Sequence, residues 1–464
     1  MTTLMANVSL SAEQLAALTA IVGTERLTTS SADLHLHARD QSFHSPHPPA
    51  VVLMPETTEQ VSQILRYANA HRLPVTAWGV GTSLEGNSIA VHGGIMLDFG
   101  QMNKILEVRP ADFQVDVQPG ITRIELNKAL ARHGLFFTPE PGANATIGGM
   151  IATNAAGIKT IKYGATRENV LRLEVVKADG EIITVGTRAR KNSSGYSLLH
   201  LFIGSEGTLG IITQATLRLA PIPSEYSAVL AAFEGVDQAM QAVVEIVGAG
   251  LEPTALEFVD KETVAALNQD KGMNFVVAPS VIMEFIGSGE GEQLQLALDI
   301  CREAGATQFE AARGTEARNK LWEVRHHTYE SLVRLHPNKA QKIIDVCVPL
   351  SRYPELVLHS DKVLREHGLI GYKFGHAGDG NLHINVVHTP DDAAELAQVE
   401  KANDEIVRFG LSLEGTITGE HGVGIGKRKF MAAQHGPAYD VMRQIKQLFD
   451  PNGILNPGKI FTET

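Results

Sequence analysis

Two short segments rich in glycine and histidine contain the residues best suited to chemistry. The first is Gly-His-Ala-Gly-Asp-Gly-Asn-Leu-His at residues 375–383, and the second is Thr-Gly-Glu-His-Gly-Val-Gly-Ile-Gly at residues 418–426. Together they supply two imidazoles, a carboxylate and a further imidazole: His376, His383, Glu420 and His421. The first three are ordinary ligands of zinc or manganese, and three protein ligands leave a coordination position for a substrate. His421 would then act as a base beside the metal.

Glycines around these residues would permit the turns that such a site requires. Gly375, Gly378 and Gly380 allow positive φ between the two histidines. The alternation that begins at His383 is typical of a strand, so His383 and Asn385 would share one face. The alternative is a glycine-rich loop with surface histidines, which a chain with 18 histidines allows.

The composition is that of an ordinary globular chain of two or three domains. It has 464 residues, of which 44% are hydrophobic and 20% charged, with a net charge of −12. No dense run of Lys or Arg is present, so neither nucleic acid nor an anionic membrane is an expected partner. Cys301 and Cys347 are isolated, which excludes a disulfide framework and a cysteine-based zinc site.

Targeting signals are not expected. No basic residue precedes Arg26, so the positive region of a signal peptide is absent. No apolar run is long enough to be a transmembrane segment. We therefore expect a cytoplasmic protein, with a peripheral position at the inner face of a membrane left open. The oligomeric state is also left open, a dimer included.

The first half of the chain has the periodicity of alternating helices and strands. A capping box at Ser11 opens a helix through Ile21. The later pattern predicts strands at 50–54, 74–78, 95–99, 105–108, 114–117 and 215–219, helices at 56–71 and 122–133, and a hairpin at 171–185. Pro221 and Pro223 then indicate a domain boundary near residue 222.

Two segments of small residues in this half could contact a ligand through their backbone. Trp-Gly-Val-Gly-Thr-Ser-Leu-Glu-Gly at 78–86 follows a buried strand and could form a phosphate-binding nest. It lacks the Gly-Lys-Ser/Thr of a Walker loop, and no helical pattern follows it as in a nicotinamide fingerprint. The second segment is 141–157. The alternatives are an ordinary turn for the first segment and tight helix–sheet packing for the second.

The second half has mixed strands with helices expected on one face, typical of an α+β domain. We expect strands at 228–233, 255–259, 281–286 and 343–348, helices at 236–247, 293–303, 353–366 and 393–409, and one long helix at 316–334. An amphipathic helix at 439–449 and a turn-rich tail would pack back onto another domain.

The motifs at 79–86, 141–157, 204–210, 375–383, 419–422 and 456–459 fall in an order that resembles one family. That family is the FAD-dependent D-2-hydroxyacid dehydrogenases of the vanillyl-alcohol oxidase/p-cresol methylhydroxylase superfamily. The resemblance spans about residues 48–460 and is nearest to the cytochrome-type D-lactate dehydrogenase branch. Glycolate oxidase catalytic subunits and D-2-hydroxyglutarate dehydrogenases are near relatives.

The resemblance implies an α+β protein with a two-lobed FAD-binding domain of the p-cresol methylhydroxylase type and a substrate domain with a mixed or antiparallel sheet. The domains would be 1–222 for FAD, with two α/β lobes, 223–414 for substrate, and 415–464 as a segment that completes the active site. FAD would be non-covalent, because the loop at 79–86 contains neither His nor Cys. The implied FAD contacts are Trp78, Gly79, Val80, Gly81, Thr82, Ser83, Leu84, Gly86, Pro141, Gly142, Ala143, Thr146, Gly148, Gly149, Thr153, Ala155, Gly157, Tyr163, Gly164, Glu206, Gly210, Ile211, Ile212 and Asn456.

The implied reaction is oxidation of a small D-2-hydroxy acid, D-lactate above all, with hydride transfer to flavin N5. One divalent metal, zinc or manganese, would bind to His376, His383 and Glu420, and His421 would be the base. Arg325 would bind the substrate carboxylate. Tyr329 and Asn385 are further substrate-binding candidates, with His326 and His327 as lesser ones.

One departure from the family pattern bears on the substrate. The 2-hydroxyglutarate enzymes have a Lys two residues before the Asp that corresponds to Asp345, where this chain has Ile343, with Lys342 one residue off. Small monocarboxylic acids are therefore favoured. The electron acceptor could be a cytochrome, a quinone or an electron-transfer flavoprotein. The alternatives are a glycolate or D-2-hydroxyglutarate dehydrogenase, a non-redox flavoprotein transferase of the same superfamily, and a metal-dependent hydrolase without flavin.

Overall fold

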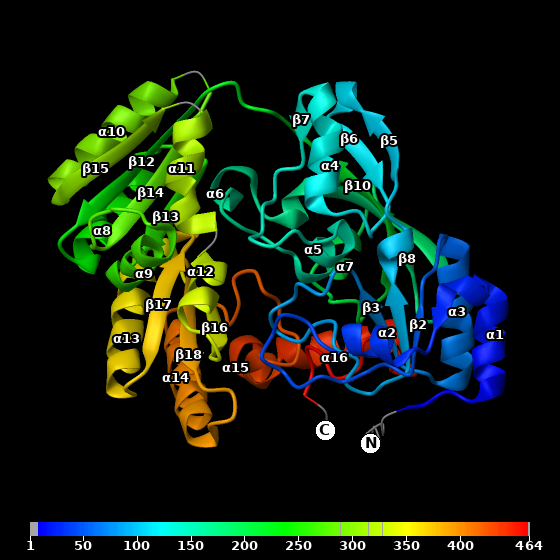
Figure 1. The fold of residues 1–464 in the computed structure, drawn as a ribbon. Helices are drawn as coiled ribbons and strands as arrows, with labels where there is room; N and C mark the ends of the chain where they lie inside the picture. Colours follow the sequence, from blue (N-terminus) through cyan, green and yellow to red (C-terminus); the bar gives the residue numbers. More distant parts are fainter. Residues whose placement is uncertain (1–7, 288, 314, 327, 463–464) are drawn as a thin grey trace. The chain divides into compact units, whose positions relative to one another are not determined.

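In a computed structural model, the chain forms two compact units (Figure 1). The structure describes residues 8–287, 289–313, 315–326 and 328–462. Of these residues, the first unit contains 8–155, 165–222 and 420–462, and the second contains 156–164 and 223–419. Within the described part of the chain, no helix has the length and apolar character needed to cross a membrane.

The first unit contains a four-stranded sheet in the order β1-β2-β4-β3. The strands are β1 (Leu27–Thr28), β2 (Val51–Leu53), β4 (Ile95–Asp98) and β3 (Val75–Trp78). The last three are parallel, and β1 is antiparallel to β2. Helix α3 (Thr58–His71) buries the predicted apolar face, which includes Val61, Ile64, Leu65 and Ala68. Ser11 and Gln14 form the predicted capping box of α1 (Ala12–Val22), and α2 (Ser31–Leu36) follows.

A second, five-stranded sheet in this unit has the order β5-β6-β10-β8-β9. Its strands are β5 (Ile105–Arg109), β6 (Gln114–Val117), β10 (Ile211–Arg218), β8 (Val170–Val176) and β9 (Ile182–Gly186). All its pairs are antiparallel. This lobe is therefore antiparallel α+β rather than α/β. The remaining α-helices and strands of the unit are α4 (Arg123–Leu130), β7 (Leu135–Phe136), α5 (Ile147–Thr153), α7 (Leu199–Phe202), β11 (Ala220–Pro221), α15 (Met431–His435) and α16 (Ala438–Phe449).

The second unit is built on a seven-stranded sheet, β15-β12-β14-β13-β17-β18-β16. The strands are β12 (Tyr226–Phe233), β13 (Ala255–Val259), β14 (Ser280–Ile286), β15 (Ala306–Arg313), β16 (Ala340–Cys347), β17 (Ile370–Gly375) and β18 (Asn381–His388), and each pair is antiparallel. The helices are α6 (Thr160–Tyr163), α8 (Val236–Gly248), α9 (Lys261–Lys271), α10 (Glu290–Glu303), α11 (Thr315–His326), α12 (Thr328–Leu335), α13 (Tyr353–Glu366) and α14 (Ala393–Ser412).

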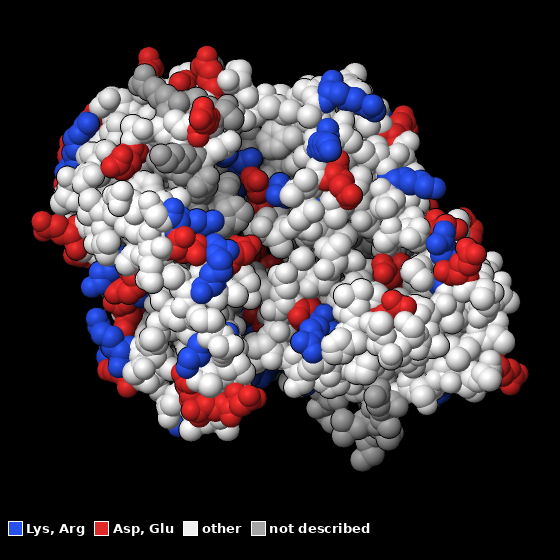
Figure 2. Space-filling model, viewed as in Figure 1, with Lys and Arg blue, Asp and Glu red and all other residues white. Residues whose placement is uncertain are grey.

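One expectation for this unit was wrong. All five residues of β13 and all eight of β18 are buried. Since neighbouring strand residues point to opposite faces, both faces of the sheet are covered, not one. The long helix expected at 316–334 falls on α11 and α12, which lie on either side of residue 327, a residue outside the described part of the chain. On the face drawn in Figure 2, acidic and basic side chains are interspersed without a broad field of one sign.

Candidate active site

Two buried histidines lie close together at the hairpin of β17 and β18. His376 directly follows β17, and His383 lies within β18, opposite Phe374. The two imidazole centroids are 5.1 Å apart and their planes are nearly perpendicular. One ring nitrogen of His376 and one ring nitrogen of His383 lie within 4.8 Å of each other. The structure thus brings together two of the three predicted metal ligands, and both side chains are buried rather than on the surface.

The glycines beside and between these histidines serve two purposes. Only Gly380 of the three predicted positions has positive φ, at +74°. At Gly375 the reason is space, because a Cβ would collide with the carbonyl oxygen of Asn381. Of the positive φ values that these three glycines allow, the backbone therefore uses only the one at Gly380. A close approach of the two strands explains Gly375 instead.

Glu257 is a functional candidate that sequence reasoning missed. Its Oε1 accepts a hydrogen bond from Nδ1 of His376 at 2.7 Å, and its Oε2 accepts one from Nε of Arg325, also at 2.7 Å. Burial alone would raise the pKa of this carboxyl, but its interactions with His376 and Arg325 outweigh burial, so its pKa is lowered. The available signal was a single acid in the otherwise apolar strand Ala-Leu-Glu-Phe-Val, since buried acids usually have partners.

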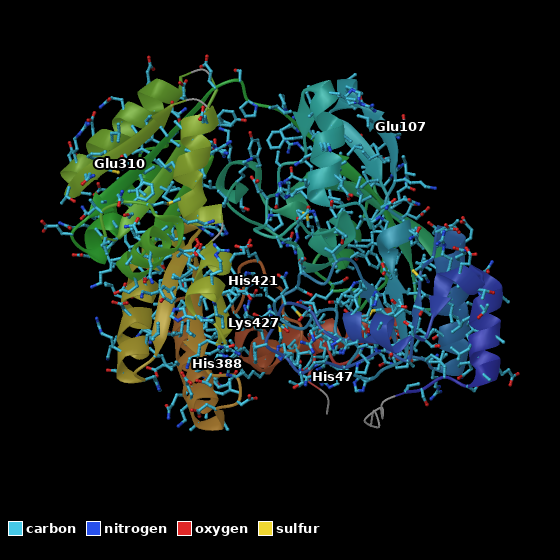
Figure 3. The ribbon with its side chains drawn as sticks, viewed as in Figure 1. His47, Glu107, Glu310, His388, His421 and Lys427 are labelled. Atoms are coloured by element: carbon cyan, nitrogen blue, oxygen red, sulfur yellow. The ribbon has the colours of Figure 1, made fainter. Side chains whose placement is uncertain are left out.

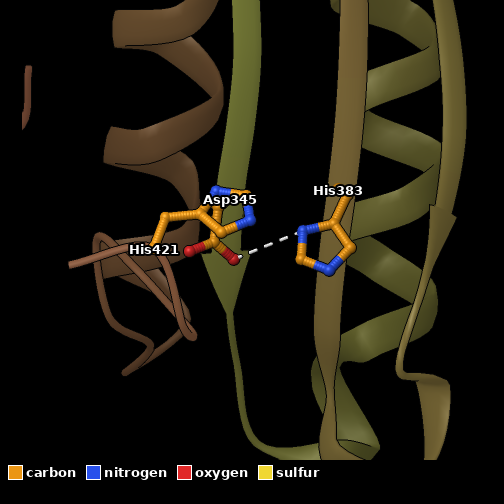
Figure 4. A group of neighbouring side chains, drawn as sticks. All are labelled: Asp345, His383 and His421. Atoms are coloured by element: carbon orange, nitrogen blue, oxygen red, sulfur yellow. Dashed lines mark ion pairs between the residues drawn. The ribbon is translucent and has the colours of Figure 1, made fainter. Parts of the chain in front are cut away.

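Asp345 is a second carboxylate that sequence reasoning did not assign to the site. It lies opposite His383 in the ladder of β16 and β18. Its Oδ1 is 3.6 Å from Nδ1 of His383 (Figure 4), too long for a hydrogen bond. Its Oδ2 accepts hydrogen bonds from Oγ1 of Thr418 at 2.7 Å and from the backbone N–H of Gly419 at 2.9 Å. Asp345 therefore holds Thr418 and Gly419, the last two residues of the second unit.

Glu420 and His421 come directly after Gly419 and belong to the first unit. Nε2 of His421 is 3.8 Å from Oε1 of Glu420. The backbone after His421 is held by Glu206, whose carboxylate accepts hydrogen bonds from the N–H of Val423 at 2.6 Å and of Gly424 at 2.9 Å. His421 and Lys427 mark this segment in Figure 3.

Glu206, a predicted FAD contact, thus also organises the predicted catalytic segment. Its Oε2 accepts a further hydrogen bond from Nδ2 of Asn87 at 2.8 Å. Burial raises the pKa of the Glu206 carboxyl, and these hydrogen bonds only partly oppose that effect. Asn456, another predicted FAD contact, donates to the carbonyl oxygens of Asn87 at 2.9 Å and Glu206 at 2.7 Å. The side chains of Glu206 and Asn456 therefore have structural roles inside the first unit.

The predicted substrate-binding residues lie in the second unit. Arg325, on α11, is only 9% exposed, and its guanidinium lies 4.9 Å from the centroid of the Phe374 ring. Tyr329, on α12, is half-buried, and burial raises the pKa of its hydroxyl. Asn385 is buried and donates to Oε1 of Gln341 at 2.8 Å. His327 lies outside the described residues, as does the side chain of His326.

The position that distinguishes the 2-hydroxyglutarate enzymes lies on the same strand as Asp345. Ile343 is opposite Asn385 and two residues from Asp345, so it shares their face of the sheet. Lys342 points to the other face, where its Nζ is 2.7 Å from Oε1 of Glu400. No cation from this pair therefore lies on the face of Asp345 and His383.

The loop at 79–86 has the backbone features of a phosphate-binding nest. It connects β3 to β4, and Gly81 has φ of +67°. Within the described part of the chain, the N–H groups of residues 80–84 have no protein acceptor. Gly79 packs so closely against Thr146, the N-cap of α5, that a Cβ would collide with its hydroxyl. These donors fit an anionic ligand such as a pyrophosphate.

The other predicted FAD contacts are divided between the units. Residues 141–155 and 206–212 belong to the first unit, as does the loop at 79–86. Gly157, Tyr163 and Gly164 belong to the second unit, because residues 156–164 pack with it. Burial raises the pKa of the Tyr163 hydroxyl to about 12.

Comparisons with known proteins match this architecture. Residues 222–460 match the family described as FAD linked oxidases, C-terminal domain, and residues 49–186 match the FAD binding domain. The chain is 39% identical over 450 residues to a probable mitochondrial D-lactate dehydrogenase of Danio rerio, covering 96% of this chain and 90% of that protein. It is 34% identical over 450 residues to glycolate oxidase subunit GlcD of Bacillus subtilis, covering 96% and 95%. In structure it resembles p-cresol methylhydroxylase, with a TM-score of 0.79 and 16% identity over 97% of this chain and 96% of that one.

Proposed function

The chain belongs to the family of FAD-linked oxidases, and from this premise we propose that it oxidises a small D-2-hydroxy acid, D-lactate above all, to the 2-oxo acid. The observation that carries the proposal is the buried pair His376 and His383, with Asp345 holding Gly419 one residue before Glu420. A relative named as a D-lactate dehydrogenase, 39% identical, supports the substrate class.

FAD fits the first unit, where the backbone N–H groups of residues 80–84 have no acceptor among the residues that the structure describes. When bound, FAD supplies the acceptor for the hydride and its two electrons. The chain supplies the binding surface and the orientation of the substrate. The loop at 79–86 contains neither His nor Cys, so we expect no covalent link to it. We expect electrons to leave to a cytochrome, a quinone or an electron-transfer flavoprotein.

A divalent metal, zinc or manganese, fits the donor set of His376, His383 and Glu420. Nδ1 of His376 is engaged by Glu257, which leaves Nε2 as the ligand atom, as is usual for a metal-binding histidine. When bound, the metal supplies a Lewis acid for the substrate's oxygens. Glu420 directly follows Gly419, which Asp345 holds in the unit that contains both histidines.

Two side chains would act directly on the substrate. His421 takes the proton of the substrate hydroxyl, since a neutral imidazole is a suitable base near neutral pH. Arg325 binds the substrate carboxylate through its paired Nη groups, because its Nε already donates to Glu257. Tyr329 and Asn385 complete the proposed substrate contacts.

The proposal also concerns the size of the substrate and whether it carries a second carboxylate. Ile343 shares the face of Asp345, and Lys342 is paired with Glu400, so no lysine on β16 favours a second carboxylate. D-lactate and glycolate therefore rank ahead of D-2-hydroxyglutarate, and the likeness to a glycolate oxidase subunit keeps glycolate as the second candidate. A solved structure of alkyldihydroxyacetonephosphate synthase is 20% identical to this chain. That likeness indicates a shared fold and does not favour the alternative function of a transferase.

Anaerobic mixing of the purified flavoprotein with single 2-hydroxy acids tests the proposal. D-lactate should bleach the FAD absorbance within seconds of mixing. Glycolate should bleach it more slowly, and L-lactate and D-2-hydroxyglutarate hardly at all. Rapid bleaching by D-2-hydroxyglutarate alone would reverse the assignment of substrate size. A flavin that no 2-hydroxy acid reduces would favour the transferase, and a colourless protein that cannot take up FAD would favour the hydrolase.

A further inference from the structure

We propose that Glu257 is a positioning residue that orients the metal ligand His376 and the carboxylate-binding Arg325 together. The inference rests on the proposed function, because that function assigns the roles of His376 and Arg325. Glu257 itself touches neither substrate nor metal in this scheme. It lies on β13, and its side chain is fully buried.

The contact geometry gives each oxygen of Glu257 a separate task. Oε1 accepts from Nδ1 of His376 at 2.7 Å, so the proton of a neutral His376 is placed on Nδ1 and the lone pair on Nε2. Oε2 accepts from Nε of Arg325 at 2.7 Å, which sets the plane of the guanidinium. A shift of this one carboxylate would therefore misplace the metal ligand and the substrate cation at the same time.

Glu284 is a second buried glutamate on the same sheet, and its contacts provide a comparison for those of Glu257. Glu284, on β14, is opposite Ala255, while Glu257 is opposite Ile282, so both glutamates share one face of adjacent strands. Oε2 of Glu284 accepts from Nε of Arg318 at 2.5 Å and from Nε1 of Trp322 at 2.8 Å. Both Glu257 and Glu284 are 0% exposed.

Helix α11 makes the two pairs comparable. Arg318 and Arg325 are seven residues apart on this helix, which places them two turns apart on one face. Each arginine therefore connects α11 to the sheet through a buried glutamate. The second partner differs: it is Trp322 on the same helix for Glu284, and His376 after β17 for Glu257. Fastening α11 needs no histidine, so the contact with His376 points to a role beyond stability.

The experiment compares Glu257→Gln with Glu284→Gln in the FAD-loaded protein. After removal of metal by a chelator, each variant is titrated with Zn²⁺ and, separately, Mn²⁺, and steady-state kinetics with D-lactate are measured. Loss of an outer partner of a metal-binding histidine typically weakens metal binding by about 10- to 100-fold. We expect that loss and a raised KM for Glu257→Gln, with FAD content unchanged, and at most a twofold change for Glu284→Gln.

Glu257→Asp provides a second variant if the glutamine does not fold. It keeps the charge but shortens the reach, and it should lower metal affinity less than Glu257→Gln while still raising KM. The inference would be overturned if Glu257→Gln or Glu257→Asp had the parent's metal affinity and KM. It would also be overturned if Glu284→Gln lost as much metal affinity as Glu257→Gln. If the parent protein binds neither Zn²⁺ nor Mn²⁺, both the proposed metal-dependent function and the inference about Glu257 fail. If His376→Ala abolishes metal binding and the Glu257 variants do not weaken it, the inference about Glu257 alone fails.

Discussion

The backbone N–H of Gly419 donates to Oδ2 of Asp345 at 2.9 Å, one residue before Glu420 and two before His421. Oγ1 of Thr418 donates to the same oxygen at 2.7 Å. Since consecutive Cα atoms are about 3.8 Å apart, this contact limits where the carboxylate of Glu420 and the imidazole of His421 can lie. Asp345 thus connects the strand opposite His383 to the start of the proposed catalytic segment.

The first prediction concerns this contact. Asp345→Asn replaces an acceptor oxygen by an amide that cannot accept from all of Thr418, Gly419 and Asn381, so it should lower kcat/KM for D-lactate at least tenfold. Thr418→Val removes only one of these hydrogen bonds and should have a smaller effect. FAD content, measured by absorbance, should stay at the parent's value in both. Equal kcat/KM in all three proteins would show that the contact does not matter for turnover.

The second prediction concerns the attachment of FAD. Because the loop at 79–86 contains neither His nor Cys, acid precipitation should release the whole yellow chromophore as FAD into the supernatant. The measurement is the absorbance and chromatographic identity of the released flavin. Chromophore retained in the washed pellet would show a covalent bond elsewhere in the chain.

The third prediction concerns the metal. His383→Ala removes one of two buried imidazoles whose centroids are 5.1 Å apart, so it should lose the bound divalent ion and turnover together. FAD should remain, because the loop at 79–86 is in the other unit. Elemental analysis of the purified variant measures the first effect and anaerobic flavin reduction the second. His336→Ala, which removes a histidine bonded to Tyr372 at 2.7 Å, is the control and should keep its metal. Full activity in a metal-free parent would rule out a catalytic ion.

The fourth prediction concerns Arg325. Arg325→Lys keeps the charge but loses the guanidinium fork, and it weakens the buried contact with Glu257. It should lower kcat/KM by a factor equivalent to about 2–4 kcal/mol. Arg318→Lys is the matched control, because it changes a buried pair on the same helix without a proposed substrate contact. It should lower the melting temperature but leave KM near the parent's. A similar KM increase in both variants would assign the effect to helix packing.

Local elements were predictable from the sequence because their signals are local. The apolar face of α3 follows from the spacing of Val61, Ile64, Leu65 and Ala68, and all four are buried. The capping box of α1 follows from Ser11 and Gln14. The pairing of His376 with His383 was also accessible, since only a short turn separates them.

The contacts of Glu257 were not predictable in this way. Its partners Arg325 and His376 are 68 and 119 residues away in the chain, so no local pattern connects them. The role of Asp345 toward Gly419 joins residues 74 apart and was missed for the same reason. Helix α9 and strand β15 were also missed; α9 has few apolar residues, among them Val264 and Leu267, which are buried.

The last prediction concerns His421. His421→Ala should lower the rate of anaerobic flavin reduction by D-lactate by about 10²- to 10⁴-fold, the usual contribution of a positioned general base. FAD and metal content should stay at the parent's values, because His421 is not among the proposed ligands. Added imidazole should restore part of the rate, since it can accept the hydroxyl proton in place of the missing side chain. His435→Ala, in which the changed histidine ends α15, is the control and should react at the parent's rate. Flavin reduction by His421→Ala at the parent's rate, or a slow rate that imidazole leaves unchanged, would assign the base to another residue, and His326 or His327 would be the next to test.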